Sequence, residues 1–546
     1  MSVSNPTDSH WVRPRGRIVL RGGHVVDARE EAPRRADVAV EDGVVAEIGD
    51  VAPRTGDEVL DSTGRLVMPG LVDAHSHTDG LLGDESVQRS LLRQGVTSVI
   101  TGQDGVSYAP GDGAYGSECF AAINGPHPTY PGGGVAAYLA TVDGASRLNA
   151  AYLVPAGTVR SVVCGRSREA ADASQLASMV GLVADGLREG AVGLSTGLDY
   201  VPGIFQTTQE IAALTVPVAR AGGVYVSHMR GGYEANSAAG IDEIVSIARF
   251  ASEHVAGNGL RVHVSHFHAD ADIVLKQLDT LDAAGVDATF DAYPYIRGCS
   301  LLGMPLLPPE LAVQPVDEVV QALSDPAERA RLRRDWFPRV ERNPSLGPDW
   351  PHMITFAHLA APQLGWAHGL TIAQAAARAG TDPIDFALDA MRDCRLRTNV
   401  IMAVQTPRPV SELARIFEHP HHMGGSDGIF IGAHPHPRAR GTFAQYLRTY
   451  VRETGTWSWA DAAHHLSFRP ATRFGLGRRG VIEPGAVADI IVVDPDSVAD
   501  AATYDEPLHD AVGIDDVLVA GIPVLAGGEL TAMPQGRLPG RGLRRS

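Results

Sequence analysis

The sequence is poor in lysine and cysteine. Lys276 is the only lysine among 46 basic residues, so any chemistry that needs a lysine side chain has one candidate in this chain. The four cysteines lie far apart and show no paired spacing, which argues against a disulfide framework and against a cysteine-based zinc motif. We therefore expect the protein to work in a reducing compartment such as the cytoplasm.

Long apolar runs and an excess of positive charge are also missing. The sequence has no stretch of about 18 uninterrupted apolar residues that could cross a membrane, and its opening segment MSVSNPTDSHWVRPRG lacks the apolar core of a signal peptide. The 46 basic and 64 acidic residues give a formal net charge of -18, which repels phosphate backbones. We expect a small-molecule substrate and neither a nucleic acid nor a membrane as partner.

The two ends of the chain resemble each other in pattern. Residues 17–65 and 485–528 consist of short apolar runs separated by Gly and Asp turn signals, which is typical of strands and hairpins. We expect residues 1–66 and 480–546 to form one small β-sandwich built from both termini. The last residues, GRLPGRGLRRS, are expected to be a frayed basic tail.

The middle of the chain alternates between strand-like runs and helical spacers. The expected strands are residues 66–73, 97–102, 150–155, 191–197, 224–230, 261–267 and 287–295, and a last run that ends at HHMGGSDG. This alternation predicts an α/β fold in which residues 67–479 form a (β/α)8 TIM barrel. The runs at 353–358 and 399–404 could also be strands.

A long insertion interrupts the alternation at about residues 300–352. It begins with the proline-rich MPLLPPE and continues as a charged helical stretch. An insertion after a barrel strand forms a loop beside the site, so it could be a lid or a surface elaboration without a catalytic part.

Histidine and aspartate residues close several of the barrel runs. His75 and His77 follow the first run, and residues two apart on an extended chain point to the same side. His228 ends VYVSH, His266 ends VHVSH and Asp427 ends HHMGGSD. The carboxyl ends of barrel strands share one face, and imidazole and carboxylate are suitable ligands for zinc, manganese, cobalt or iron. The pattern predicts a metal-dependent hydrolase.

Several motifs together resemble those of a known family. They are MPGLVDAHSH, GAVGLSTGLDY at 190–200, GGVYVSHMR, VSHFH, DAYPY, SDG with HPHPRARGTF at 434–443, and the terminal GVIEPGAVADIIVVDP. Over nearly its full length the sequence resembles the amidohydrolase superfamily, and within it the N-acyl-D-amino-acid deacylases, also called D-aminoacylases. The resemblance implies a barrel, a composite β-sandwich and a lid-like insertion.

The resemblance also implies a metal centre with one or two Zn²⁺ ions or other divalent transition metals. Its expected ligands are His75, His77, His228, His266 and Asp427, and Asp427 is also the expected general base. The family's pattern has a cysteine ligand in a Gly-Asn-Cys-Gly turn, which here reads Gly-Gln-Asp-Gly at residues 102–105. We expect Asp104 to act as a harder ligand that can bridge two ions, the alternative being a turn residue only.

Five residues are expected to contact the substrate. By resemblance, Arg438 anchors the substrate carboxylate, although it could be a structural arginine, and Tyr200 is a substrate contact. His268 replaces a family lysine that helps to hold this carboxylate, which makes it a weaker and pH-dependent partner. Tyr293 and Tyr295 could donate hydrogen bonds to the developing oxyanion or could be packed structurally.

These expectations define one function and two alternatives. We expect metal-bound hydroxide to attack the amide of an N-acyl-D-amino acid while Asp427 carries the proton to the leaving amine. A cyclic amide or lactam hydrolase, similar to hydantoinase or dihydroorotase, is one alternative, but its bridging carboxylated lysine is not expected here because Lys276 falls in a helical segment. A non-catalytic scaffold is the other, although no ligand is visibly lost. A homo-oligomer is compatible with a barrel of this size.

Overall fold

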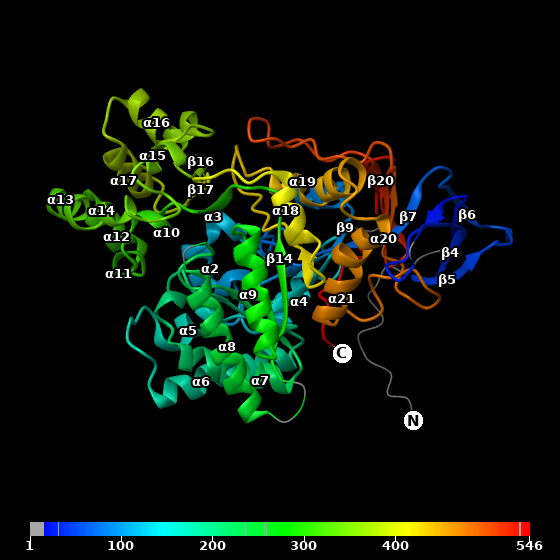
Figure 1. Cartoon of the computed structure of the whole chain (residues 1–546), viewed down its shortest axis with the longest axis horizontal. Helices are drawn as coiled ribbons and strands as arrows, with labels where there is room; N and C mark the ends of the chain where they lie inside the picture. The colour runs from blue at the N-terminus through cyan, green and yellow to red at the C-terminus, as the bar shows by residue number, and fades with distance from the viewer. Residues whose placement is uncertain are drawn as a thin grey trace.

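The computed structural model describes residues 16–30, 32–234, 236–255, 257, 259–533 and 537–545. At its centre, eight neighbouring parallel strands form a sheet that runs from β8 to β18 (Figure 1). The strands are β8 (Leu71–Asp73), β9 (Val96–Thr101), β10 (Asn149–Pro155), β11 (Gly193–Gly197), β12 (Val224–His228), β13 (Arg261–Val264), β14 (Asp287–Ala292) and β18 (His422–Gly424). Ala74 N–H donates to the Gly424 carbonyl at 3.1 Å, and Ser76 bridges Gly428, which closes the sheet into a barrel. The expected TIM barrel is confirmed.

Helices cover the outside of this barrel. The longer ones are α1 (Glu85–Arg93), α4 (Val135–Val142), α5 (Ala156–Cys164), α6 (Ala173–Arg188), α7 (Thr208–Arg220), α8 (Ser237–His254), α9 (Ala271–Ala283), α18 (Val410–Phe417) and α19 (Arg438–Gln445). Shorter segments are η2 (Gln103–Gly105), α2 (Ala114–Cys119), α3 (Ala121–Asn124), η3 (Gly203–Phe205), η5 (Tyr446–Glu453), α20 (Trp459–Ala463), η6 (His464–Phe468) and α21 (Arg469–Phe474). Strands enclosed by helices outside and side chains inside must be apolar on both faces, and all six residues of β9 are buried.

Both ends of the chain contribute to a two-sheet sandwich beside the barrel. One sheet contains β1 (Ile18–Arg21), β4 (Asp37–Glu41), β5 (Val44–Gly49) and β6 (Glu58–Asp61). The other contains β2 (His24–Val25), β3 (Arg34–Arg35), β7 (Leu66–Pro69), β19 (Ile490–Val493), β20 (Ile514–Val519), β21 (Ile522–Ala526) and β22 (Glu529–Leu530). Val38, Val67 and Ile490 belong to one apolar core, so side chains of both sheets pack together. Residues 1–15, which the expected sandwich also included, lie outside the described part.

A separate lobe is inserted between β14 and α18. It contains β15 (Gly298–Leu301), α10 (Gly303–Leu306), α11 (Pro309–Ala312), α12 (Val316–Ser324), α13 (Pro326–Asp335), α14 (Phe337–Val340), α15 (Trp350–Met353), β16 (Ile354–Leu359), η4 (Pro362–Ala367), α16 (Ile372–Ala379), α17 (Pro383–Asp393) and β17 (Thr398–Met402). The runs at 353–358 and 399–404 therefore belong to a three-stranded antiparallel sheet of this lobe and not to the barrel. The lobe has its own apolar core and lies at the opposite end of the molecule from β4–β6 (Figure 1).

The C-terminal segment 537–545 packs under the barrel. Gly540 N–H donates to the Ser146 carbonyl at 2.8 Å, and Leu543 N–H donates to that of Ala150 at 2.7 Å. Leu543 is buried in one apolar cluster with Val192 and Val224, which lie at the amino ends of β11 and β12. The expectation of a frayed tail is wrong for these residues, because apolar burial and backbone pairing outweigh their basic composition; Gly536 and Ser546 lie outside the described residues. None of the described helices is long and apolar enough to cross a membrane.

Candidate metal centre

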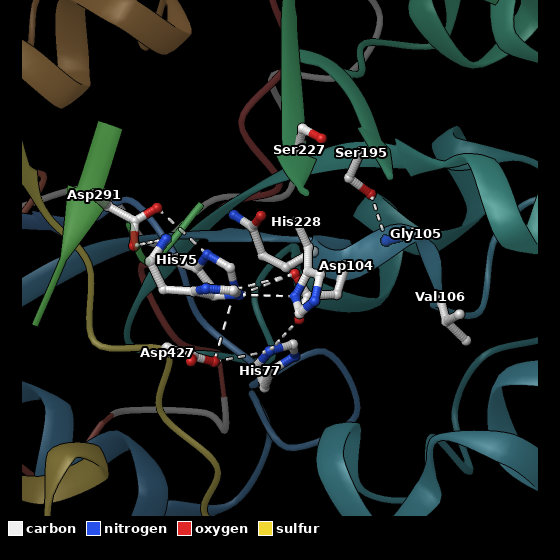
Figure 2. Close-up of polar contacts among 12 residues, drawn as sticks. His75, His77, Asp104, Gly105, Val106, Ser195, Ser227, His228, Asp291 and Asp427 are labelled. Atoms are coloured by element: carbon white, nitrogen blue, oxygen red, sulfur yellow. Dashed lines mark hydrogen bonds and ion pairs between the residues drawn. The ribbon is translucent and has the colours of Figure 1, made fainter. Parts of the chain in front are cut away.

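Six potential ligands meet at the carboxyl ends of the barrel strands. They are His75 and His77 after β8, Asp104 in η2 after β9, His228 at the end of β12, His266 after β13 and Asp427 after β18. All six side chains are buried, and Figure 2 shows most of them converging on one point. The structure thus brings together every residue that the sequence proposes as a ligand, because parallel strands end on the same face.

Asp104 lies at the centre of this group. Its Oδ1 atom is 3.7 Å from Nε2 of His75 and 3.7 Å from Nε2 of His266. Its Oδ2 atom is 3.7 Å from Nε2 of His77 and 3.7 Å from Nδ1 of His228. One carboxylate therefore faces four imidazoles, two with each oxygen, which is the arrangement that a bridging ligand needs.

Asp427 lies at the edge of the cluster. Its Oδ1 atom is 3.2 Å from Nε2 of His77 and 3.8 Å from Nε2 of His75. Its Oδ2 atom is 2.9 Å from Nη1 of Arg438. That N–H bond does not point at the oxygen, so the contact is an ion pair without a directed hydrogen bond. The carboxylate thus connects the cluster to a fully buried guanidinium.

The ligand atoms form two groups that share His75. His75, His77 and Asp427 make one group, and His75, Asp104 and His266 make the other. Within each group the ligand atoms lie within 4.8 Å of one another. His228 adjoins the second group, since its Nδ1 atom is 3.1 Å from Nε2 of His266.

Three of these residues have a left-handed backbone. The φ angles are 53° at Asp104, 31° at His266 and 48° at Asp427. Residues other than Gly rarely adopt a positive φ, and backbone strain of this kind is often found at functional sites. At Gly102, where φ is 77°, a Cβ atom would collide with the Leu153 carbonyl, so the turn before Asp104 requires glycine. The local chain is shaped to aim these side chains inward.

The charges in the cluster favour a bound cation. Burial disfavours charged imidazole, but the carboxylates of Asp104 and Asp427 outweigh it and raise the pKa of His77 to about 10. Asp104 and Asp199 likewise raise the pKa of His228 to about 10 against the effect of burial. Burial opposes ionisation of Asp104, yet the surrounding imidazoles hold its pKa well below the usual range.

The donor set also fits a divalent metal. His75 Nε2 and Asp104 Oδ1 are buried polar atoms without a hydrogen-bond partner, although they face each other across 3.7 Å. Buried polar atoms normally have a bonding partner, and a cation between these two atoms would provide one for both. Imidazole nitrogen and carboxylate oxygen are ligands that zinc accepts.

A second layer of polar residues orients the ligands, and the sequence reasoning missed it. Asp291 Oδ2 lies 3.4 Å from His75 Nδ1 and 2.8 Å from His263 Nε2, and its Oδ1 atom accepts the His266 N–H at 2.9 Å. Asn124 Oδ1 lies 3.0 Å from His77 Nδ1, which directs Nε2 of that ring at the cluster.

Asp199 belongs to the same layer, since its Oδ2 atom lies 3.4 Å from Nε2 of His228. Asp199 and Asp291 stand in the motifs GLSTGLDY and DAYPY, so a signal for them existed in the sequence. Asn124 lies in the short helix α3, away from any strand end, and has no such signal.

The expected substrate residues fall into two sets. Tyr293, His268 and Arg438 lie together: the Tyr293 ring is 4.0 Å from the His268 ring and 4.6 Å from the Arg438 guanidinium carbon. Tyr200 packs 5.0 Å from the His228 ring and its hydroxyl is 2.9 Å from Ser300 Oγ.

Tyr295 is placed differently. Its buried hydroxyl has no hydrogen-bond partner and occupies the space that a Cβ atom at Gly441 would need. Its ring packs 5.4 Å from that of His436 and 6.3 Å from that of Tyr504. The side chain is thus surrounded by packing contacts away from the ligand cluster.

The surroundings of His268 favour its neutral form. Burial and the positive charges of Arg408, His266 and Arg438 hold its pKa well below the ordinary value. Its Nε2 atom accepts the Tyr293 N–H at 3.1 Å, so the remaining ring nitrogen carries the proton. His268 can offer one neutral hydrogen bond to a substrate.

A hollow lies between the barrel and the lobe. Asp199 and Tyr200 line its inner end, and Leu301, Met304 and Leu307 line the side of the lobe. The lobe therefore forms part of the surroundings of the site.

Comparison with known proteins identifies relatives over nearly the whole chain. A profile of the amidohydrolase family matches residues 58–293 and 348–525. An N-acyl-D-glutamate deacylase of Alcaligenes xylosoxydans xylosoxydans is 32% identical, over 97% of this chain and 96% of that protein. A D-aminoacylase of the same organism is 29% identical, over 96% of this chain and 97% of that protein.

A solved structure shares the fold. N-acyl-D-glutamate deacylase from Bordetella bronchiseptica, in complex with zinc and a phosphonate that mimics the tetrahedral intermediate, has a TM-score of 0.78 and 29% identity. The match covers 96% of this chain and 99% of that one. With the barrel, the sandwich and the histidine and aspartate cluster in place, the chain belongs to the amidohydrolase family.

Proposed function

We propose that this protein is a metal-dependent hydrolase that removes the acyl group from an N-acyl-D-amino acid. The observation that carries the proposal is the buried cluster in which Asp104 faces four imidazoles while Asp427 adjoins two of them. Full-length relatives that are named as deacylases of N-acyl-D-amino acids support the choice of substrate.

One or two divalent ions, zinc in the first place, fit the cluster. His75, His77 and Asp427 would hold an ion at one group, and His75, Asp104 and His266, adjoined by His228, would hold an ion at the other. A bound zinc ion lowers the pKa of water toward neutrality and polarises a carbonyl group.

Asp427 would carry the proton. Burial alone would raise its pKa, but the positive charges of Arg438 and the neighbouring imidazoles hold the pKa well below its usual range, so the carboxylate is ionised and can accept a proton. The carboxylate would take the proton from water and pass it to the nitrogen of the leaving amine.

Arg438 and Tyr293 would orient the substrate. Arg438 is fully buried, and its Nε atom has no hydrogen-bond partner, which leaves one N–H for a substrate carboxylate beside the contact with Asp427. No described residue hydrogen-bonds the hydroxyl of Tyr293, so this group is free to donate to the amide oxygen.

A cyclic amide hydrolase with a carboxylated lysine is disfavoured. Lys276 is exposed on α9, outside the barrel, and cannot reach the cluster from there. We infer that Asp104, which faces four imidazoles, would take the part of such a bridge.

We also propose that the protein works in the cytoplasm. Cys119, Cys164, Cys299 and Cys394 are all unpaired, as expected in a reducing compartment.

Turnover and metal content measured on one sample test the function. The panel contains N-acetyl D- and L-amino acids with acidic and apolar side chains, together with hydantoin and dihydroorotate. We expect hydrolysis of at least one D-enantiomer with one or two zinc ions bound per chain. Selective turnover of a cyclic amide, or purified protein that binds no divalent transition metal, would overturn the proposal.

A further inference from the structure

Arg408 points into the protein from an exposed loop. The loop returns from β17 of the lobe to α18 of the barrel, and Thr406, Pro407 and Pro409 are exposed. Arg408 is only 9% exposed. Its side chain must therefore be turned inward, against the usual preference of arginine for the surface.

The start of α18 fixes where this side chain enters. Glu412 Oε1 accepts the Ala271 N–H at 2.8 Å, so the first turn of α18 is tied to the beginning of α9. The loop just before α9 carries His266 and His268. Arg408 lies four residues before Glu412, in the loop that leads into α18.

Arg408 has no protein partner among the described residues. Its Nε and Nη1 atoms are buried without a hydrogen bond, and it forms no ion pair with any described residue. Arg160, which is also buried, shows the usual arrangement, because its Nη1 atom lies 2.8 Å from Glu210 Oε1. A buried guanidinium normally has a counter-ion, so Arg408 lacks an anion.

The surroundings of Arg408 carry excess positive charge. Arg408 and Arg438 both lie within electrostatic reach of Tyr293 and His268. Asp427 is the carboxylate paired with Arg438, and it faces the metal ligands with its other oxygen. Arg438 already contacts Asp427, which leaves it only part of its guanidinium for a substrate, whereas Arg408 pairs with no described residue.

We propose that Arg408 is a substrate-binding residue that holds a carboxylate of the N-acyl amino acid through its guanidinium fork. The inference rests on the proposed function, because it assigns one of the groups that the substrate presents to the site. A planar guanidinium can bind both oxygens of a carboxylate, and the buried setting strengthens such a pair. The carboxylate is either the α-carboxylate or that of an acidic side chain.

Kinetics on amide derivatives distinguish these two sources. Zinc-loaded wild type, Arg408→Met and Arg408→Lys are compared on N-acetyl-D-glutamate, on its α-amide and on its γ-amide. We expect Arg408→Met to raise KM about 10- to 100-fold on N-acetyl-D-glutamate, with kcat within about threefold, and Arg408→Lys to have a smaller effect. If Arg408 binds the α-carboxylate, the rise in KM persists on the γ-amide and disappears on the α-amide. The reverse identifies the side-chain carboxylate.

Arg415→Gln is the matched control. Arg415 lies on α18 as well, but it is exposed and pairs with Asp272 and Glu412. We expect its KM to equal that of the wild type. An unchanged KM for Arg408→Met, or an equal rise on all three substrates, overturns the inference.

Two further measurements separate this inference from the proposed function and from a structural role. Binding of the product D-glutamate to the zinc-loaded proteins, measured by calorimetry, needs no turnover, and Arg408→Met should weaken it at least about tenfold; equal affinities overturn the inference. The Tm of Arg408→Met should match or exceed that of the wild type, because the side chain makes no described hydrogen bond or ion pair. A wild type that binds D-glutamate yet hydrolyses no N-acyl amino acid refutes the proposed function alone.

Discussion

The Oδ2 atom of Asp427 lies 2.9 Å from Nη1 of Arg438, and both side chains are buried. The proposed proton carrier is therefore held by the residue that is expected to orient the substrate. A carboxylate bound to Arg438 would share the guanidinium with Asp427, so substrate position and proton transfer depend on the same arginine.

Replacement of Asp427 by asparagine tests the proton carrier. The side chain keeps its shape but loses the proton acceptor, so we expect kcat to fall by about 10²- to 10⁴-fold while the protein stays folded. Steady-state kinetics with circular dichroism measure both. Asp242→Asn, an exposed position on α8, is the control and should retain full activity. Activity of Asp427→Asn within tenfold of the wild type would contradict the assignment.

Asp104→Asn tests whether this carboxylate binds metal. Asparagine tolerates the φ of 53° but removes the negative charge that faces four imidazoles. We expect the zinc content, measured by elemental analysis after dialysis, to fall by at least one ion per chain in a protein that binds two, and zinc affinity to fall in one that binds a single ion. Asp104→Cys places a soft thiolate ligand at this position, so its zinc content should be close to that of the wild type. Wild-type zinc content and affinity in Asp104→Asn would show that Asp104 is only a turn residue.

Gly102→Ala tests the backbone that aims Asp104. The substitution adds a Cβ atom against the Leu153 carbonyl at a positive φ, and we expect it to cost about 2 kcal/mol of unfolding free energy. Gly181→Ala is the matched control on α6. The backbone there is helical, and a Cβ atom would have no atom within 4 Å outside the helix's own backbone. The unfolding free energy of Gly181→Ala should rise by about 0.5–1 kcal/mol, because alanine has a higher helix propensity than glycine. Chemical denaturation measures both, and equal effects would refute the argument.

His465 predicts a pH dependence of stability. Burial lowers its pKa to about 4, while its Nδ1 atom bonds the His422 carbonyl at 2.9 Å and its ring stacks on Trp457. The folded pKa lies below the unfolded value of about 6.5, so the unfolded chain binds more protons. This contribution is complete above about pH 6.5 and is lost as the pH falls toward 4.

The variant His465→Gln isolates this contribution. The Tm of the wild type should fall more steeply between pH 7 and pH 5 than the Tm of His465→Gln. His509→Gln, at an exposed position, should behave as the wild type does. Parallel Tm curves for His465→Gln and the wild type would refute the prediction.

The candidate site can be predicted best from the sequence where barrel strands end. His228 and His266 could be proposed because each closes an apolar run, and parallel strands bring such ends together whatever separates them in the chain. Asn124 could not be proposed as the partner of His77, because a contact between distant segments leaves no local pattern. Asp291 stands in the motif DAYPY, but that motif does not indicate its contact with His75.

Tyr293 and Tyr295 show that side-chain alternation predicts neighbours only within a strand. Residues two apart share a face only while the chain is extended, and β14 ends at Ala292. Tyr293 therefore stays beside Arg438, whereas Tyr295 packs against His436. No sequence pattern predicts that Arg408 is buried, because its inward orientation depends on the path of the loop between the lobe and the barrel.

The buried C-terminal segment has a consequence for synthesis. Leu543 completes the apolar filling at the amino ends of the barrel strands, and residues 540–543 pair with backbone beside β10. A nascent chain cannot close the base of its barrel while these residues are still inside the ribosome. The base can therefore close only after residues 540–543 have left the ribosome, and a chain without residues 537–545 should keep an assembled barrel that is open at its base.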